Sequence, residues 1–212
     1  MKPKIDYTLY LVTDRDLMTA DSIEECVRQA ISGGCTVIQL REKTASSYEF
    51  YDTALRLRKV TASLGVPLII NDRADIALAV DADGVHVGQK DLPYEVVRRI
   101  IGPDKIVGVS THTLKQAKLA EKMGADYIGV GAMFATGTKS DATPAGVDVL
   151  RNIRKEVNIP MVAIGGISKN NVSLLTDTGV DGIAVVSAVV AEHDIAGAAR
   201  ELKALLIKGE NL

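Results

Sequence analysis

Eight short apolar runs, separated by segments with helical periodicity, constrain the fold of this chain more than any other feature of its sequence. The runs cover residues 7–12, 36–40, 66–70, 84–87, 106–109, 127–130, 160–164 and 182–186. Most of them lack the polar–apolar alternation of a strand with one solvated face. They therefore indicate strands that are buried on both faces, as in a parallel sheet.

The segments between the runs predict helices. Apolar residues from 23 to 31 follow the spacing of a single helix face. Ser22 with Glu25 and Thr113 with Gln116 have the spacing of a capping box at two helix starts.

A short pattern repeats before three of the predicted strands, where a small residue is followed by Asp83, Asp126 or Asp181 and then by the strand. Eight strand–helix units with short links predict an α/β fold, a single (β/α)8 TIM barrel over residues 1–212. A doubly wound open sheet is the alternative. It is disfavoured because no Gly-x-Gly-x-x-Gly turn follows the first strand.

The composition excludes several classes of protein. A net charge of −2 argues against nucleic acid or a membrane surface as the main partner. Cys26 and Cys35 are too few for a disulfide framework, and no His or Cys cluster has zinc spacing. No export segment opens the chain and no run approaches 18 apolar residues, so we expect a cytoplasmic protein.

Charged residues follow the second predicted strand, in the sequence Gln39-Leu40-Arg41-Glu42-Lys43. Strand alternation places Gln39, Arg41 and Lys43 on one face, at the barrel end where active sites form. Two cations and an amide suit a diphosphate. The alternative is a solvated loop in which Glu42 pairs with its neighbours.

Carboxylates follow the next two predicted strands, Asp72 after the third and Asp91 after the fourth. Mg²⁺ prefers one or two carboxylates together with substrate phosphates and water, so the two residues form a candidate Mg²⁺ pair. Each could instead cap a helix, Asp72 before Arg73 and Asp91 before Pro93. Their position beside the cationic strand end favours the metal site.

Ser110 and His112 follow the fifth predicted strand. Ser110 can hydrogen-bond a substrate. A hydrolytic Ser/His pair is disfavoured because the chain has no Gly-x-Ser-x-Gly elbow and no residue that orients His112, which could equally be a structural hydrogen-bonder.

Loops after the last three strands carry glycines and hydroxyls. Residues 131–143 contain several hydroxyls and Lys139, and predict either a mobile lid over an anionic ligand or a flexible link. Gly165-Gly166 and Val186-Ser187 follow strands seven and eight, where many barrels bind phosphate through backbone N–H groups. A tight strand-to-helix turn would also explain the two glycines.

Seven segments, in order and across nearly the whole chain, resemble the successive motifs of the thiamine-phosphate synthase family. They are Gln39-Leu40-Arg41-Glu42-Lys43, Asn71-Asp72, Gly88-Gln89 with Asp91, Gly108-Val109-Ser110 with His112, Thr136-Gly137-Thr138-Lys139, Ile164-Gly165-Gly166-Ile167 and Val186-Ser187. Two positions depart from that pattern. Ala132 stands where Pro is typical, and Arg73 stands where an acidic residue is also common.

The resemblance implies the following roles. Hydroxymethylpyrimidine diphosphate would be held by Gln39, Leu40, Arg41, Glu42, Lys43, Asn71, Ser110 and Lys139. Thiazole phosphate, with or without an extra carboxylate, would be held by Thr136, Gly137, Thr138, Gly166, Val186 and Ser187. One Mg²⁺ would bind Asp72 and Asp91, and the catalytic residues would be Arg41, Lys43, Ser110 and Lys139.

The implied reaction is a substitution at the pyrimidine methylene. Diphosphate leaves, a stabilised pyrimidine carbocation forms and the thiazole nitrogen attacks it. Mg²⁺ and the three cations would stabilise charge on the leaving group, while loop closure would exclude water. The alternatives are a thiazole tautomerase that uses His112 as acid and base, and a non-catalytic regulatory barrel. On any of these readings the protein could be a homo-oligomer.

Overall fold

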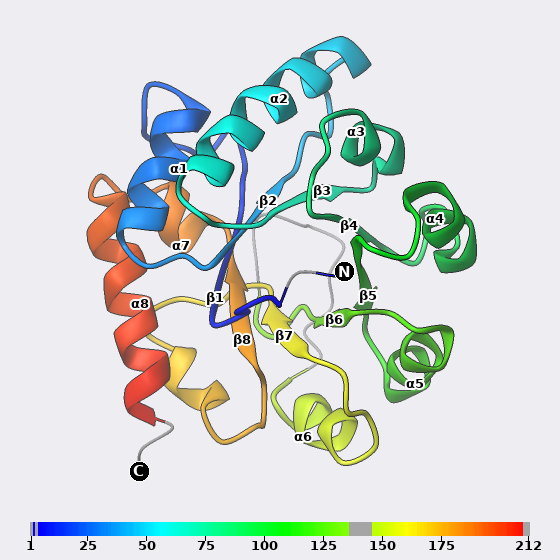
Figure 1. Ribbon diagram of the computed structural model, residues 1–212. Helices are drawn as coiled ribbons and strands as arrows, with labels where there is room; N and C mark the ends of the chain where they lie inside the picture. Colours follow the sequence, from blue (N-terminus) through cyan, green and yellow to red (C-terminus); the bar gives the residue numbers. More distant parts are fainter. Residues whose placement is uncertain (1, 3, 136–145, 210–212) are drawn as a thin grey trace.

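Eight parallel strands close into a barrel in the order of the sequence, which confirms the predicted (β/α)8 fold (Figure 1). The computed structural model describes residues 2, 4–135 and 146–209. The strands are β1 Leu9–Val12, β2 Val37–Leu40, β3 Leu68–Asn71, β4 Gly84–Val87, β5 Ile106–Thr111, β6 Tyr127–Val130, β7 Met161–Ile164 and β8 Gly182–Val185. Each lies within two residues of its predicted run at both ends.

Helices surround the strands as an outer ring (Figure 1). They are α1 Ile23–Ser32, α2 Ser47–Ser63, α3 Ala74–Ala79, α4 Tyr94–Ile101, α5 Leu114–Met123, α6 Asp148–Arg154, α7 Ser187–Val190 and α8 Ile195–Gly209. Unit seven carries a 3₁₀ helix, η1 Val172–Leu175, in place of an α-helix. Each helix that follows a strand returns the chain to the amino end of the barrel, so all strand ends meet at one mouth.

At both predicted capping boxes, the contact made by the N-cap side chain is present. Ser22 Oγ and Thr113 Oγ1 accept the N–H groups of Glu25 and Gln116 at 3.2 and 3.3 Å, as an N-cap requires. The Gln116 side chain, however, accepts from the His112 N–H and not from the cap residue. The complete capping box lies at α2, between Ser46 and Glu49.

Two hydrophobic cores share the strands. Residues that point outward, such as Leu40 and Ile70, pack against the helices. Residues that point inward, such as Tyr10, Ile69 and Tyr127, fill the barrel interior. Both faces of every strand are therefore covered, which explains why the runs do not alternate between apolar and polar residues.

The repeated Asp residues form clamps at the amino end of the barrel. Each side chain accepts a backbone N–H from the preceding strand and a guanidinium N–H from an earlier helix. The contacts are Leu68 and Arg58 with Asp83, Val107 and Arg98 with Asp126, and Met161 and Arg154 with Asp181. Thr36 completes the series before β2, because its Oγ1 accepts the Leu9 N–H at 3.1 Å. The four clamps recur at every second strand and tie neighbouring strands at their starts.

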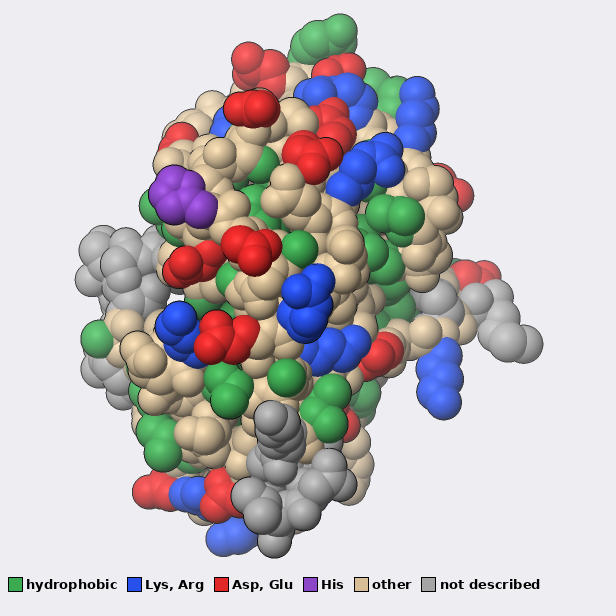
Figure 2. Space-filling model, turned by 90° about the vertical axis from the view of Figure 1, so that its left-hand side faces the viewer, with side chains coloured by type: hydrophobic (Ala, Val, Ile, Leu, Met, Phe, Trp, Pro, Cys, Tyr) green, Lys and Arg blue, Asp and Glu red, His purple; other side chains and the backbone are tan. Residues whose placement is uncertain are grey.

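The surface over α1 and α8 carries acidic and basic side chains interspersed, with hydrophobic side chains scattered between them (Figure 2). Among the described residues, no patch of a single charge sign dominates that face. Within residues 2, 4–135 and 146–209, no helix has both the length and the apolar character needed to cross a bilayer.

Candidate active site

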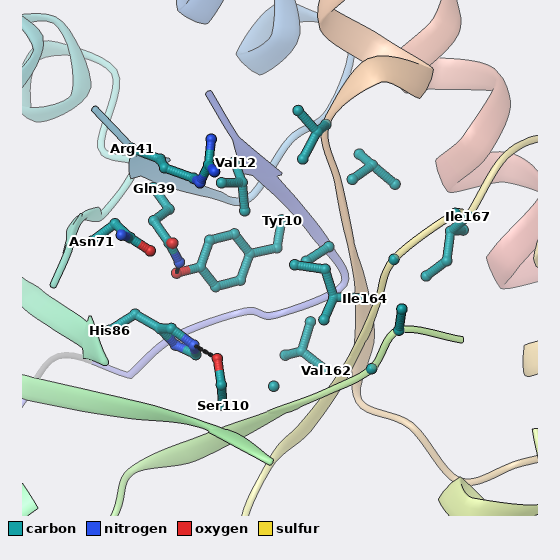
Figure 3. A pocket seen from close by; sticks show the side chains of 18 of the residues that line it. Tyr10, Val12, Gln39, Arg41, Asn71, His86, Ser110, Val162, Ile164 and Ile167 are labelled. Carbon is teal, nitrogen blue, oxygen red and sulfur yellow. Dashed lines mark hydrogen bonds between the residues drawn. The ribbon is translucent and has the colours of Figure 1, made fainter. Parts of the chain in front are cut away.

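A cavity of about 590 Å³ opens at the carboxyl ends of the strands, a size typical of small-molecule sites. Strand alternation aims inward-facing side chains into it, and Figure 3 shows these side chains converging from opposite sides of the barrel. Tyr10 lies at its floor. The prediction that residues far apart in the chain share one mouth is therefore met by the described part of the chain.

The wall formed by β2 to β5 is polar. Arg41, Lys43, Asn71 and Ser110 all line the cavity. Arg41 Nη1 lies 3.3 Å from Asp14 Oδ2 after β1, and this ion pair holds the guanidinium at the mouth. Both partners are less than one-fifth exposed, so the pair is partly shielded from solvent.

Asp72 and Asp91 lie together on this wall. Asp72 adopts a left-handed backbone conformation, with φ of 64°, which is uncommon for a residue other than glycine. Its carboxylate accepts from Lys43 Nζ at 2.5 Å. Asp91 Oδ2 accepts the Gly88 N–H at 2.7 Å. Neither residue acts as the predicted helix cap, because Arg73 and Pro93 occupy the cap positions of α3 and α4.

The surroundings of Asp91 disfavour the charged form of its carboxyl. Burial raises the pKa of the Asp91 carboxyl, and the neighbouring Asp72 carboxylate raises it further, against the opposing effect of the Gly88 N–H and Lys43. Two carboxylates that disfavour each other's charge gain from a shared divalent ion. Among the described residues, no group of three or more His, Cys, Asp or Glu side chains could hold a metal. A hard cation here would thus need substrate phosphates and water as further ligands, as Mg²⁺ does.

Leu40 and Glu42 do not point into this cavity. Leu40 is fully buried among the outer core residues. The Glu42 side chain accepts from Arg15 at 2.7 Å and lines a separate surface hollow beside α2. The alternation that brings Gln39 and Arg41 inward turns the residues between and after them outward, so no side-chain contact with a ligand in the cavity is expected for these two.

The opposite wall, from β7 and β8, is lined by backbone. Gly165 and Gly166 have φ of 99° and 67°, a region that side chains disfavour. A Cβ at Gly166 would lie 2.5 Å from the Ala135 carbonyl oxygen, so only glycine fits this close approach. Val186 and Ser187 line the same wall at the start of α7. Peptide groups in such a wall can donate hydrogen bonds to phosphate oxygens.

Ser110 and His112 do not form a hydrolytic pair. Ser110 Oγ lies 2.8 Å from His86 Nε2. His112 Nδ1 is bonded to the Gly131 carbonyl oxygen at 2.5 Å, and the carbonyl can only accept, so Nδ1 carries the proton. His112 lines the cavity but acts here as a structural hydrogen-bonder. The predicted residues Thr136, Gly137, Thr138 and Lys139 lie outside the described part of the chain.

Several residues of the site carry no obvious sequence signal. Asp14 orients Arg41, while Tyr10, His86 and Tyr127 form a buried polar cluster beneath Ser110. The cluster could have been anticipated only in part. His86 alternates with Val85 and Val87 in a buried strand, so it had to face the barrel interior.

The fold and the site define the class: a (β/α)8 barrel whose cavity joins a cationic, carboxylate-bearing wall to a glycine-lined one. A family model described as "Thiamine monophosphate synthase" matches residues 9–189. The chain belongs to the thiamine monophosphate synthase family.

Relatives cover nearly the full length. The chain is 59% identical to the thiamine-phosphate synthase of Clostridium beijerinckii, over 98% of this chain and all of that one. It is 58% identical to the thiamine-phosphate synthase of Ruminiclostridium cellulolyticum, over 98% and 99% of the two chains. The solved structure of thiamine phosphate pyrophosphorylase from Pyrococcus furiosus superposes with a TM-score of 0.89 at 44% identity, over 96% and 97% of the chains.

Proposed function

We propose that this protein is a thiamine-phosphate synthase, a transferase that joins hydroxymethylpyrimidine diphosphate to thiazole phosphate and releases diphosphate. The observation that carries the proposal is the two-sided cavity. Arg41, Lys43, Asp72 and Asp91 lie on one wall, and Gly166 lies on the other. A pair of substrates, with a diphosphate on one side and a single phosphate on the other, matches this division.

The diphosphate would lie against Arg41 and Lys43. The Arg41 guanidinium can donate two parallel hydrogen bonds to phosphate oxygens, and Lys43 adds a mobile point charge. Asp72 and Asp91 would hold one Mg²⁺, which would neutralise charge on the diphosphate as it leaves. The donor set fits this ion, because two carboxylates leave the remaining positions to phosphate and water.

The reaction breaks the bond between the pyrimidine methylene carbon and the diphosphate oxygen, and the electron pair leaves with diphosphate. The thiazole nitrogen then supplies its lone pair to the methylene cation, so no side chain has to act as a base. Gln39, Asn71 and Ser110 would orient the pyrimidine, since all three face the cavity, from β2, β3 and β5. Gly166, Val186 and Ser187 would place the thiazole phosphate opposite.

Lys139 and residues Thr136 to Thr138 belong to the same proposal, as further contacts from the loop after β6. We also propose that residues 1–212 act as one catalytic domain in the cytoplasm. The proposal includes assembly as a homo-oligomer.

Supplying both substrates with and without Mg²⁺ tests the function. We expect thiamine phosphate and diphosphate in equal amounts, only with the metal. Asp91→Asn should lose most of this activity, while Asp52→Asn on the exposed side of α2 should not. Conversion of thiazole phosphate alone, with no product from the pair of substrates, would favour the tautomerase.

A further inference from the structure

A chain of four hydrogen bonds runs along the cavity floor from β2 to β5. Gln39 Nε2 donates to Tyr10 Oη at 2.7 Å, and Tyr10 Oη lies 2.8 Å from Tyr127 Oη. Tyr127 Oη lies 2.9 Å from His86 Nδ1, and His86 Nε2 lies 2.8 Å from Ser110 Oγ. Figure 3 shows the first and last contacts, Gln39 with Tyr10 and His86 with Ser110. Of the five residues that these hydrogen bonds join, only Ser110 is a predicted catalytic residue.

The direction of the chain follows from its first donor. The Gln39 amide nitrogen can only donate, so Tyr10 Oη accepts and turns its own proton toward Tyr127. Tyr127 then donates to His86 Nδ1, which leaves the histidine proton on Nε2. His86 Nε2–H donates to Ser110 Oγ. The Ser110 hydroxyl proton is therefore directed away from His86 and toward the cavity.

We call the hydrogen-bonded residues Gln39, Tyr10, Tyr127, His86 and Ser110 the relay. Burial keeps its two phenols protonated. Tyr10 and Tyr127 are each about 1% exposed. Desolvation raises the pKa of both phenols above the ordinary value, and for Tyr127 the neighbouring Tyr10 adds to the effect. Each phenol therefore retains one O–H to donate, and each buried oxygen has a partner, as an apolar interior requires.

The strands are built around this chain. A Cβ at Gly108 would lie 2.2 Å from the Tyr127 ring and 2.5 Å from His86 Nδ1. A Cβ at Gly129 would lie 3.2 Å from His86 Cε1. Neither glycine has a positive φ, so the space they leave, and not backbone freedom, explains them. β5 and β6 thus make room for the histidine and tyrosine next to Ser110.

We propose that Tyr10, Tyr127 and His86 are positioning residues that hold the Ser110 hydroxyl as an obligate hydrogen-bond donor to an acceptor atom of the pyrimidine diphosphate. The relay selects substrate orientation because an acceptor must face Ser110, whereas a donor there would meet a hydrogen already pointing at it. The kinetic part of this inference rests on the proposed function. The tautomer of His86 does not.

The first test is the ¹⁵N NMR spectrum of the imidazoles in the ligand-free protein, with the His86 signals assigned from the spectrum of His86→Gln. We expect the Nε2–H tautomer. An Nδ1–H tautomer would overturn the proposal whether or not the protein makes thiamine phosphate. The expected tautomer in a protein without synthase activity would instead refute the proposed function and leave the relay intact.

The second test is a double-mutant cycle. Tyr127→Phe should lower kcat/KM for the pyrimidine diphosphate by about tenfold, the size of one hydrogen bond, and leave KM for thiazole phosphate unchanged. In a Ser110→Ala background, the same substitution should change kcat/KM by less than about twofold, because the hydroxyl that the relay orients is then absent.

The matched control is Tyr7→Phe. The Tyr7 ring packs 4.7 Å from that of Tyr127, but its hydroxyl is not part of the relay. The Tyr7→Phe variant should retain full activity and the same His86 tautomer as the wild type. An equal tenfold loss from Tyr127→Phe with and without Ser110 would show that Tyr127 has only a structural role, and would overturn the proposal. If Tyr127→Phe does not fold, Tyr10→Phe replaces it in the same cycle.

Discussion

Lys43 Nζ and Asp72 Oδ2 lie 2.5 Å apart across the ends of β2 and β3. A lysine predicted to bind the diphosphate is thus paired with a predicted metal ligand. The Lys43 side chain is about half exposed, so the pair is solvated and weak. A diphosphate and a divalent ion can therefore separate the two partners at little cost. Until the ligands bind, Lys43 offsets the negative charge of Asp72.

Asp72→Asn should abolish the metal dependence of the reaction. The amide keeps one oxygen but loses the charge that attracts Mg²⁺, and it releases Lys43 from its partner. We expect kcat/KM to fall by at least about 100-fold, with little remaining response when Mg²⁺ is raised. Initial rates over a Mg²⁺ series measure this. A variant that responds to Mg²⁺ with wild-type affinity would contradict the role of Asp72. Asp75→Asn, at an exposed position of α3, serves as the control.

Arg41→Lys should weaken pyrimidine diphosphate use although the charge is kept. Lysine cannot reproduce the planar fork of the guanidinium, nor keep both the Asp14 contact and two bonds to phosphate. We expect kcat/KM to fall by about 10- to 100-fold. Asp14→Asn should give a smaller loss of the same kind, because Arg41 remains but is less well held. Steady-state kinetics on both variants, at saturating thiazole phosphate, checks the order of the two effects.

We expect Asp91 to lower the stability of the ligand-free protein at neutral pH. Because its folded-state pKa is raised, the protonated carboxyl is favoured by folding, and this contribution is present below the unfolded-state pKa and lost as pH rises through the folded-state pKa. Asp91→Asn should therefore unfold at higher temperature than the wild type at pH 7, and at nearly the same temperature at pH 3. Thermal unfolding at both pH values in EDTA measures this. A wild type more stable than the variant at pH 7 without metal would contradict it.

The clamps at the amino end should affect stability and leave catalysis alone. The Asp126 and Arg98 side chains are 14% and 19% exposed, so Asp126→Ala removes a shielded acceptor from both Arg98 Nη2 and the Val107 N–H. We expect a loss of about 2–3 kcal/mol in the free energy of unfolding, with KM unchanged. Asp181→Ala should cost less because the Asp181 side chain is 46% exposed. Urea unfolding ranks the two, and the reverse order would contradict the argument.

The fold was predictable because its signals are local. Each strand is a continuous apolar run, and the Asp residues before β4, β6 and β8 repeat at the same place in the unit. The sequence pattern did not identify Thr36, because a hydroxyl there replaces the carboxylate while it makes the same contact with β1. The seventh unit also differs from expectation, since a 3₁₀ helix stands where an α-helix would complete the repeat.

The site was predictable where residues stand at strand ends and not where they meet inside the barrel. Arg41 and Asp72 follow β2 and β3 directly, and Asp91 lies in the loop after β4, so topology alone brings them to the same end of the barrel. Tyr10 and Tyr127 are 117 residues apart, and only the barrel register joins their hydroxyls. Leu40 and Glu42 were assigned with their neighbours as one motif, although strand alternation sends their side chains to the other face.

The central claim, that the cationic wall and the carboxylate pair form one diphosphate site, is tested most directly by calorimetric titration of the pyrimidine diphosphate into the protein without thiazole phosphate. We predict binding that requires Mg²⁺ in the wild type and is lost in Arg41→Ala. Equal affinity with Mg²⁺ and with EDTA, or unchanged binding to Arg41→Ala, would contradict the account.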